Sequence, residues 1–184
     1  LIDVFNSIKK KKPKIITFGS DINGTGKTYV IKRVINLLLQ EEKKILYISS
    51  KRKSKNSKDF PQAINSFIYN NKIENVNPEK IKENLYQNFF IVDKNIYTNI
   101  ITKEKINEFV EKCSSYDYIL WELFSPDINI LSFTNIILAS DLLVMISKFR
   151  KSSRNYNLKI LELLKEKNFY NIAGVLNYVP KAFY

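Results

Sequence analysis

The sequence predicts a single α/β domain with a mostly parallel β-sheet and helices on both of its faces. Short apolar runs alternate with longer segments of helical periodicity, which is the pattern of successive βαβ units. A polar turn containing glycines separates the first apolar run from the first helical segment. The 184 residues are enough to bury such a sheet, and the hydrophobic fraction of 45% is typical of a globular protein.

Six apolar runs predict the strands of this sheet. They cover residues 15–18, 44–49, 89–92, 118–121, 142–146 and 172–176. Helical periodicity predicts helices at residues 28–40, 61–69, 78–86, 103–113, 128–139 and 156–167, after a short helix at 2–8. Polar composition predicts surface loops at 50–58 and 70–77. In the first long helix we expect one apolar face made of Val30, Val34, Leu37 and Leu38.

The cysteine and histidine content excludes several kinds of site. The chain has one cysteine, Cys113, and no histidine, which excludes a disulfide framework, a His/Cys zinc site and a Ser-His-Asp mechanism. We expect Cys113 to be an ordinary buried or half-buried residue, and Trp121 to belong to the core. No apolar run reaches the roughly 18 residues of a membrane helix. Because the chain begins at Leu1 without a methionine, we expect residues 1–184 to be a cytoplasmic fragment of a longer protein.

The net charge of +12 comes almost entirely from lysine. Basic residues cluster at 9–14, 51–58 and 148–154, and such clusters suit solvent, an anionic membrane surface or nucleic acid. Aromatic residues are nearly missing from these clusters, although proteins that bind single strands interleave them with basic ones. A solvated surface is therefore the favoured interpretation, followed by proximity to a membrane, with nucleic acid last.

The strongest signal lies at residues 18–28, which read Phe-Gly-Ser-Asp-Ile-Asn-Gly-Thr-Gly-Lys-Thr between the first strand and the first long helix. A helix N-terminus offers unpaired N–H groups and a positive dipole end to phosphate. Gly24 and Gly26 let the backbone curl around phosphate oxygens. Lys27 can reach the β- and γ-phosphates, and the Thr28 hydroxyl can bind Mg²⁺. Asp21 occupies the first glycine position of the strict G-x-x-x-x-G-K-[ST] pattern.

We therefore predict a P-loop NTPase fold whose single domain binds ATP or ADP together with Mg²⁺. The alternative is an ordinary strand–turn–helix junction in which Gly-Lys-Thr occurs by chance. The predicted nucleotide-binding residues of the loop are Asn23, Gly24, Thr25, Gly26, Lys27, Thr28 and Tyr29.

Motifs along nearly the whole chain resemble those of the bacterial tyrosine kinases (BY-kinases), which control capsule and exopolysaccharide export. These kinases are related to the chromosome-partition and division-site-selection ATPases. The resemblance rests on Ile16-Thr17, residues 24–28, 43–49, 116–122 and 140–145, and the ending Gly174-Val175-Leu176-Asn177. It implies the same fold, a nucleotide site at the loop, and an Asn177 amide that pairs with adenine. The competing interpretation of Asn177 is a strand-ending residue in a turn.

Departures from the family's pattern fall on its acidic residues. Ser49 and Lys51 stand where the family has two aspartates, and Lys53 stands at its arginine. Glu122 replaces a later aspartate, so it is the remaining candidate for a catalytic residue and, with Thr28, for the Mg²⁺ site. Asp21 would repel phosphates and is a poor substitute for the missing aspartates. Asp3, Asn6 and Lys9 match the family's ring-assembly pattern only in part.

The sequence thus favours a nucleotide-binding, BY-kinase-like domain with weak or no catalytic activity. It would regulate or assemble a polysaccharide-export apparatus at the inner face of the cell membrane. Its partner would be a membrane polysaccharide-export protein or a membrane-embedded part of the same chain, and it could form a homo-oligomer. The alternatives are an active ATP-dependent tyrosine kinase or ATPase, and a partition-type ATPase that associates with DNA, which the composition favours least.

Overall fold

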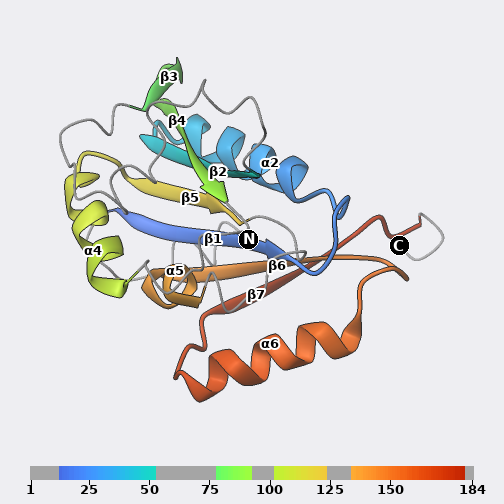
Figure 1. Cartoon of the computed structure of the whole chain (residues 1–184). Helices are drawn as coiled ribbons and strands as arrows, with labels where there is room; N and C mark the ends of the chain where they lie inside the picture. Colours follow the sequence, from blue (N-terminus) through green and yellow to red (C-terminus); the bar gives the residue numbers. More distant parts are fainter. Residues whose placement is uncertain (1–12, 53–77, 93–101, 124–133, 181–184) are drawn as a thin grey trace.

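The computed structural model describes residues 13–52, 78–92, 102–123 and 134–180, and shows one sheet with helices on both sides (Figure 1). The sheet has seven strands in the order β3-β4-β2-β5-β1-β6-β7. The strands are β1 (Lys14–Ser20), β2 (Ile45–Arg52), β3 (Glu79–Lys82), β4 (Leu85–Val92), β5 (Tyr118–Glu122), β6 (Leu142–Lys148) and β7 (Ile172–Asn177). All neighbouring strands pair in parallel except β3, which is antiparallel to β4. The predicted α/β class and mostly parallel sheet are confirmed.

Helices cover both faces, as expected for a sheet whose central strands are apolar on each side. They are α2 (Lys27–Gln40), α4 (Lys103–Lys112), α5 (Thr134–Ala139) and α6 (Arg154–Glu166). Helix α2 packs on one face against side chains of β1, β2, β5 and β6. Helices α4, α5 and α6 pack on the other face, where Trp121, 1% exposed, lies in the core together with Cys113.

Several predicted elements differ from the structure. Residues 78–86, predicted as a helix, form β3, a turn and the start of β4, with Asn84 in the left-handed region at φ 59°. Ile81 and Leu85 are spaced like one helical face, but pairing with β2 fixes Leu85 in an extended strand, and Ile81 in β3 is 46% exposed. The predicted loop at 50–58 begins inside β2, which continues to Arg52.

The apolar face of α2 is also shifted from the predicted one. Ile31, Val34, Ile35 and Leu38 are its buried apolar residues, whereas Leu37 is 41% exposed. In the region predicted as a helix at 128–139, the described part is the helix α5. The predicted helices at 2–8 and 61–69 and the predicted loop at 70–77 lie outside the described residues. Within the described ranges, no helix is both long and apolar enough to cross a membrane.

Candidate nucleotide-binding site

The loop between β1 and α2 leaves the sheet at the carboxyl end of a central strand, the edge where α/β proteins bind ligands. Gly24 and Gly26 both have left-handed backbone angles, with φ 71° and 81°, that suit glycine. Helix α2 begins at Lys27, and no side chain caps its N-terminus. The first amides of the helix are therefore not used by a side-chain cap and are available to an anion.

A second constraint acts on Gly26 from the far end of the chain. A Cβ atom at this position would collide with the amide group of Asn177, at the end of β7. Asn177 Nδ2 donates to the Thr25 carbonyl oxygen over 2.9 Å, and its Oδ1 accepts from the Tyr178 amide. The loop is thus fixed from outside as well as by its own backbone angles.

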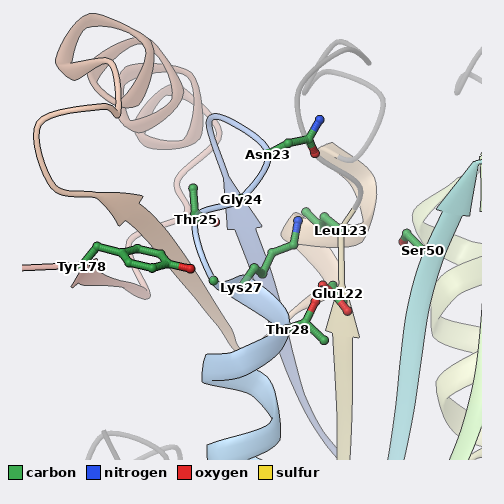
Figure 2. Close-up of a pocket in the computed structure, with 10 residues that line it drawn as sticks. Asn23, Gly24, Thr25, Lys27, Thr28, Ser50, Glu122, Leu123 and Tyr178 are labelled. Atoms are coloured by element: carbon green, nitrogen blue, oxygen red, sulfur yellow. Dashed lines mark hydrogen bonds between the residues drawn. The ribbon is translucent and has the colours of Figure 1, made fainter.

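A cavity of about 340 Å³ opens between this loop and the ends of β2 and β5 (Figure 2). Its lining combines the predicted loop with residues from other strands: Asn23, Gly24, Thr25, Gly26, Lys27, Thr28, Ser50, Glu122, Leu123 and Tyr178. The structure therefore brings Glu122 to the loop, 94 residues away from Thr28 in the sequence.

Lys27 extends into the curl of the loop in Figure 2 and is only 8% exposed. Its Nζ donates to the Ser20 hydroxyl at 3.4 Å. Burial lowers the pKa of Lys27 to about 8, and the Glu122 carboxylate opposes that shift. At neutral pH the ammonium group therefore stays charged in a poorly hydrated place, which favours binding of an anion.

Glu122 and Thr28, the two predicted Mg²⁺ ligands, are in direct contact. The Thr28 hydroxyl donates to Glu122 Oε1 over 2.7 Å, and Glu122 is 8% exposed. Both side chains offer the hard oxygen atoms that Mg²⁺ prefers, so the pair fits this ion. In the described part of the chain no group of three His, Cys, Asp or Glu residues is placed to hold a metal. An ion here would take its remaining ligands from phosphate and water, as Mg²⁺ commonly does.

The end of β2 lacks the carboxylates that the family resemblance would place there. Ser49 stands opposite Glu122 in the parallel register of β2 and β5. Ser50 lines the cavity, and its hydroxyl is buried with no hydrogen-bond partner within the described part of the chain. Lys53 lies outside the described residues. Among the described residues that line the cavity, Glu122 alone is acidic.

Asp21 points away from the place where it would repel phosphate. It is 4% exposed and does not line the cavity. Its two carboxylate oxygens accept hydrogen bonds of 2.6 Å from the Ser152 hydroxyl and the Ser153 amide, at the start of α6. Asp21 therefore ties the loop to the neighbouring β6–α6 turn.

Two other predicted binding residues have partners in the protein itself. The Tyr29 side chain is 58% exposed, its hydroxyl accepts hydrogen bonds from Arg33, and Tyr29 does not line the cavity. Among the described residues, the Asn177 amide uses one N–H and one lone pair in the contacts given above, and Asn177 does not itself line the cavity. Adenine recognition by Asn177 stays a prediction.

The sequence did not single out four residues that the structure places at or beside the cavity. Ser50, Leu123 and Tyr178 line it, and the Tyr47 hydroxyl donates to Glu122 Oε2. Tyr47 lies two residues before Ser49, so it shares the strand face of the residue that stands opposite Glu122. That spacing was the only signal for Tyr47 in the sequence. Tyr178 follows Asn177 directly, with a left-handed backbone at φ 60°.

No protein-family model and no curated protein sequence matches the chain. Solved structures do match it, over nearly its whole length but at low sequence identity. The kinase domain of Escherichia coli tyrosine kinase ETK is 12% identical with a TM-score of 0.74, and the match covers 100% of this chain and 76% of that one. The MinD cell division protein of Aquifex aeolicus is 19% identical with a TM-score of 0.67, over 92% of this chain and 71% of that one.

A plasmid partition protein from Borrelia burgdorferi is 18% identical with a TM-score of 0.62, and the match covers 94% of this chain and 84% of the partition protein. Identities this low support a shared fold and no closer statement. The chain therefore has the P-loop fold that is common to a bacterial tyrosine kinase domain and to MinD-type and partition-type proteins.

Proposed function

We propose that this domain binds ATP or ADP with Mg²⁺ at the β1–α2 loop, and that its own catalytic activity is weak or absent. The observation that carries the proposal is the cavity itself, in which a buried lysine and an uncapped helix N-terminus lie near Glu122, the one carboxylate among the described lining residues. The cation and the amides suit phosphate oxygens, while one carboxylate is fewer than positioned metal catalysis commonly uses.

Two further observations support a phosphate-bearing ligand. Ser50 lines the cavity, and its buried hydroxyl has no partner in the described part of the chain, so a ligand oxygen that reached it would supply one. A partition-type protein of the same fold from Borrelia burgdorferi, with a TM-score of 0.55, has been solved bound to AMPPNP. For a nucleotide at this loop, the exposed Tyr178 ring at the mouth of the cavity is a platform on which a base could stack.

Weak catalysis follows from the number and placement of acidic groups. Mg²⁺ would neutralise charge on the phosphates, with Thr28 as ligand and Glu122 holding it directly or through a water. Glu122 already accepts from Thr28 and Tyr47, and Ser49 opposite it cannot act as a base at neutral pH. The described residues offer the cavity neither a base nor a second metal-organising carboxylate, and phosphoryl transfer with those residues alone would be slow.

The biological role we propose is regulation or assembly of a polysaccharide-export apparatus at the inner face of the membrane. This part rests on the motif resemblance to BY-kinases and on the fold shared with a tyrosine kinase domain. The partner would be a membrane export protein or a membrane-embedded part of the same chain. Proteins of this fold also assemble with others, as the MinC:MinD complex of Aquifex aeolicus shows for that pair. A homo-oligomer is part of the proposal for the same reason.

The decisive experiment is a calorimetric titration of ATP and ADP, with and without Mg²⁺, on the wild-type domain and on Lys27→Ala. The matched control is Lys32→Ala, which removes an exposed lysine one turn along the same helix. We expect Lys27→Ala to weaken binding by at least about tenfold, because it removes a charged donor to phosphate, and Lys32→Ala to change it by less than about twofold. No binding at millimolar nucleotide would overturn the proposal.

Release of phosphate and phosphorylation of tyrosine are measured on the same samples. The alternative function, an active kinase or ATPase, is favoured by the contact between Thr28 and Glu122, because that contact preserves one place for a metal. Mg²⁺-dependent turnover that Lys27→Ala abolishes would decide for the active enzyme. Binding without turnover would decide for the regulatory domain.

A further inference from the structure

We propose that Tyr47 is a positioning residue, which holds Glu122 in the orientation that organises Mg²⁺ beside a bound nucleotide. The inference rests on the proposed function, since it concerns the same site. It assigns to this site a tyrosine on β2 that does not itself line the cavity.

The contact joins three secondary-structure elements through one carboxylate. Tyr47 projects from β2 on the face covered by α2, and is 9% exposed. Its hydroxyl donates to Glu122 Oε2, while Thr28 at the start of α2 donates to Oε1 over 2.7 Å. Each carboxylate oxygen is therefore held by one hydroxyl group. Hydrogen bonds to a charged acceptor are the stronger kind, so this pair fixes the plane of the carboxylate.

The direction of the Tyr47 hydrogen bond does not change over the working pH range. A phenol is protonated at neutral pH, so the Tyr47 hydroxyl donates and the Glu122 carboxylate accepts. Tyr47 cannot act as a base under those conditions, which leaves orientation of the carboxylate as what it contributes.

Glu122 needs such support more than an aspartate would. A glutamate side chain has one additional rotatable bond, so its carboxylate can reach more positions from the same backbone. The residue opposite it on β2 is Ser49, which has no charge to restrain it. Holding a metal-bound water depends on placement to a fraction of an ångström. The Tyr47 hydroxyl restricts the extra freedom by holding the oxygen that Thr28 does not contact.

The arrangement separates two parts of nucleotide binding. Lys27 and the amides of the loop would face the phosphates of a bound nucleotide, and the structure shows no hydrogen bond from Tyr47 to the described residues of that loop. The contribution of Mg²⁺ depends on Glu122 and Thr28. Loss of the Tyr47 hydroxyl should therefore reduce the gain in affinity that Mg²⁺ provides and leave Mg²⁺-free binding almost unchanged. A residue that served only to keep the fold intact would weaken both equally.

The test is titration of ADP and of a non-hydrolysable ATP analogue against Tyr47→Phe, in EDTA and in excess Mg²⁺. We expect the Mg²⁺-free Kd to stay within about twofold of wild type, and the Mg²⁺-dependent gain in affinity to fall by about tenfold or more, the effect of losing one hydrogen bond to a charged group. Tyr118→Phe is the matched control, because Tyr118 is buried in the same core cluster but lies at the amino end of β5, away from Glu122. It should change neither value.

Two additional variants guard against a Tyr47→Phe protein that fails to fold and test whether Tyr47 acts through Glu122. Tyr47→Leu also removes the hydroxyl group, so either Tyr47 variant that melts cooperatively supplies the measurement. In a Glu122→Gln background, Tyr47→Phe should have little further effect, because its action passes through the carboxylate charge. A Tyr47 variant that keeps the full Mg²⁺ gain, or loses Mg²⁺-free and Mg²⁺-bound affinity in parallel, would overturn the inference alone. A wild-type domain that binds no nucleotide would instead overturn the proposed function and this inference with it.

Discussion

Replacing Asp21 by alanine should destabilise the domain, although the residue lies within a phosphate loop where its charge looks unfavourable. The Asp21 carboxylate is 4% exposed and accepts two hydrogen bonds of 2.6 Å, from the Ser152 hydroxyl and the Ser153 amide. Ser152 in turn accepts from the Lys148 amide at the end of β6. Alanine would leave the donors at the start of α6 without their acceptor and would release the loop from that turn.

The size of the effect follows from these contacts. Two hydrogen bonds to a charged group contribute about 3–6 kcal/mol together. Removing a buried charge also removes its desolvation penalty, so the expected net loss in the free energy of unfolding is roughly 2–4 kcal/mol. Asp21→Asn keeps one acceptor oxygen for the Ser153 amide, and should lose about half as much. Glu162→Ala, at an exposed position on α6, is the control and should stay within about 0.5 kcal/mol of wild type.

The assay is urea unfolding followed by circular dichroism, with thermal melting alongside. For a domain of this size a loss of 2–4 kcal/mol corresponds to a melting temperature lower by roughly 4–15 °C. A double-mutant cycle of Asp21→Ala with Ser152→Ala should give a coupling of at least about 1 kcal/mol, because the two side chains are bonded. A loss below about 0.5 kcal/mol for Asp21→Ala, or strict additivity in the cycle, would refute the argument that this contact holds the loop.

Two other predictions concern pH and the glycines. Folding lowers the pKa of Lys27 to about 8, so between about pH 8 and pH 10.5 the folded protein binds fewer protons than the unfolded chain. The ligand-free domain should therefore gain stability as the pH rises through that window. Nucleotide affinity should fall over the same range, because Lys27 loses its charge. Urea unfolding and nucleotide titrations at pH 7 and 9, on wild type and on Lys27→Ala, test both predictions. If Lys27→Ala shows the same pH dependence as wild type, both are contradicted. Gly24→Ala should reduce stability by about 1 kcal/mol through its positive φ, and Gly26→Ala by roughly 2 kcal/mol or more because its Cβ also meets Asn177. Equal losses in urea unfolding would exclude a role for that contact.

Local pattern was enough to predict the central part of the fold. The runs that form β1, β5 and β6 are almost entirely buried. A short continuous apolar run between turn residues is typical of such a buried strand. The pattern failed at residues 78–86, where β3 is fully exposed and its side chains carry little information about the strand beside it. There the pairing of β4 with β2, remote in sequence, decides the conformation.

The candidate site, too, could be predicted from the sequence only in part. The loop residues that line the cavity, from Asn23 to Thr28, are contiguous and were predicted from their spacing and their place between strand and helix. The partners of Asp21 could not be predicted, because Ser152 lies 131 residues away and nothing in either segment indicates the other. Tyr47 was missed for a related reason. A tyrosine in an apolar strand is normally interpreted as a core residue, and the sequence does not indicate that Glu122 lies beside its hydroxyl group.

The hydrogen bond from Asn177 to the Thr25 carbonyl has a consequence for when the loop can reach its final conformation during synthesis of the chain. Its two residues are 152 positions apart, and the contact constrains the loop beside Gly26. During synthesis the loop emerges before β7, so the hydrogen bond from Asn177 to Thr25 forms only after β7 has been made. A nascent chain that ends before Asn177 would therefore have the loop sequence without the restraint that shapes it. If the domain binds nucleotide as proposed, the ligand should therefore stabilise the complete domain more than a chain that lacks β7.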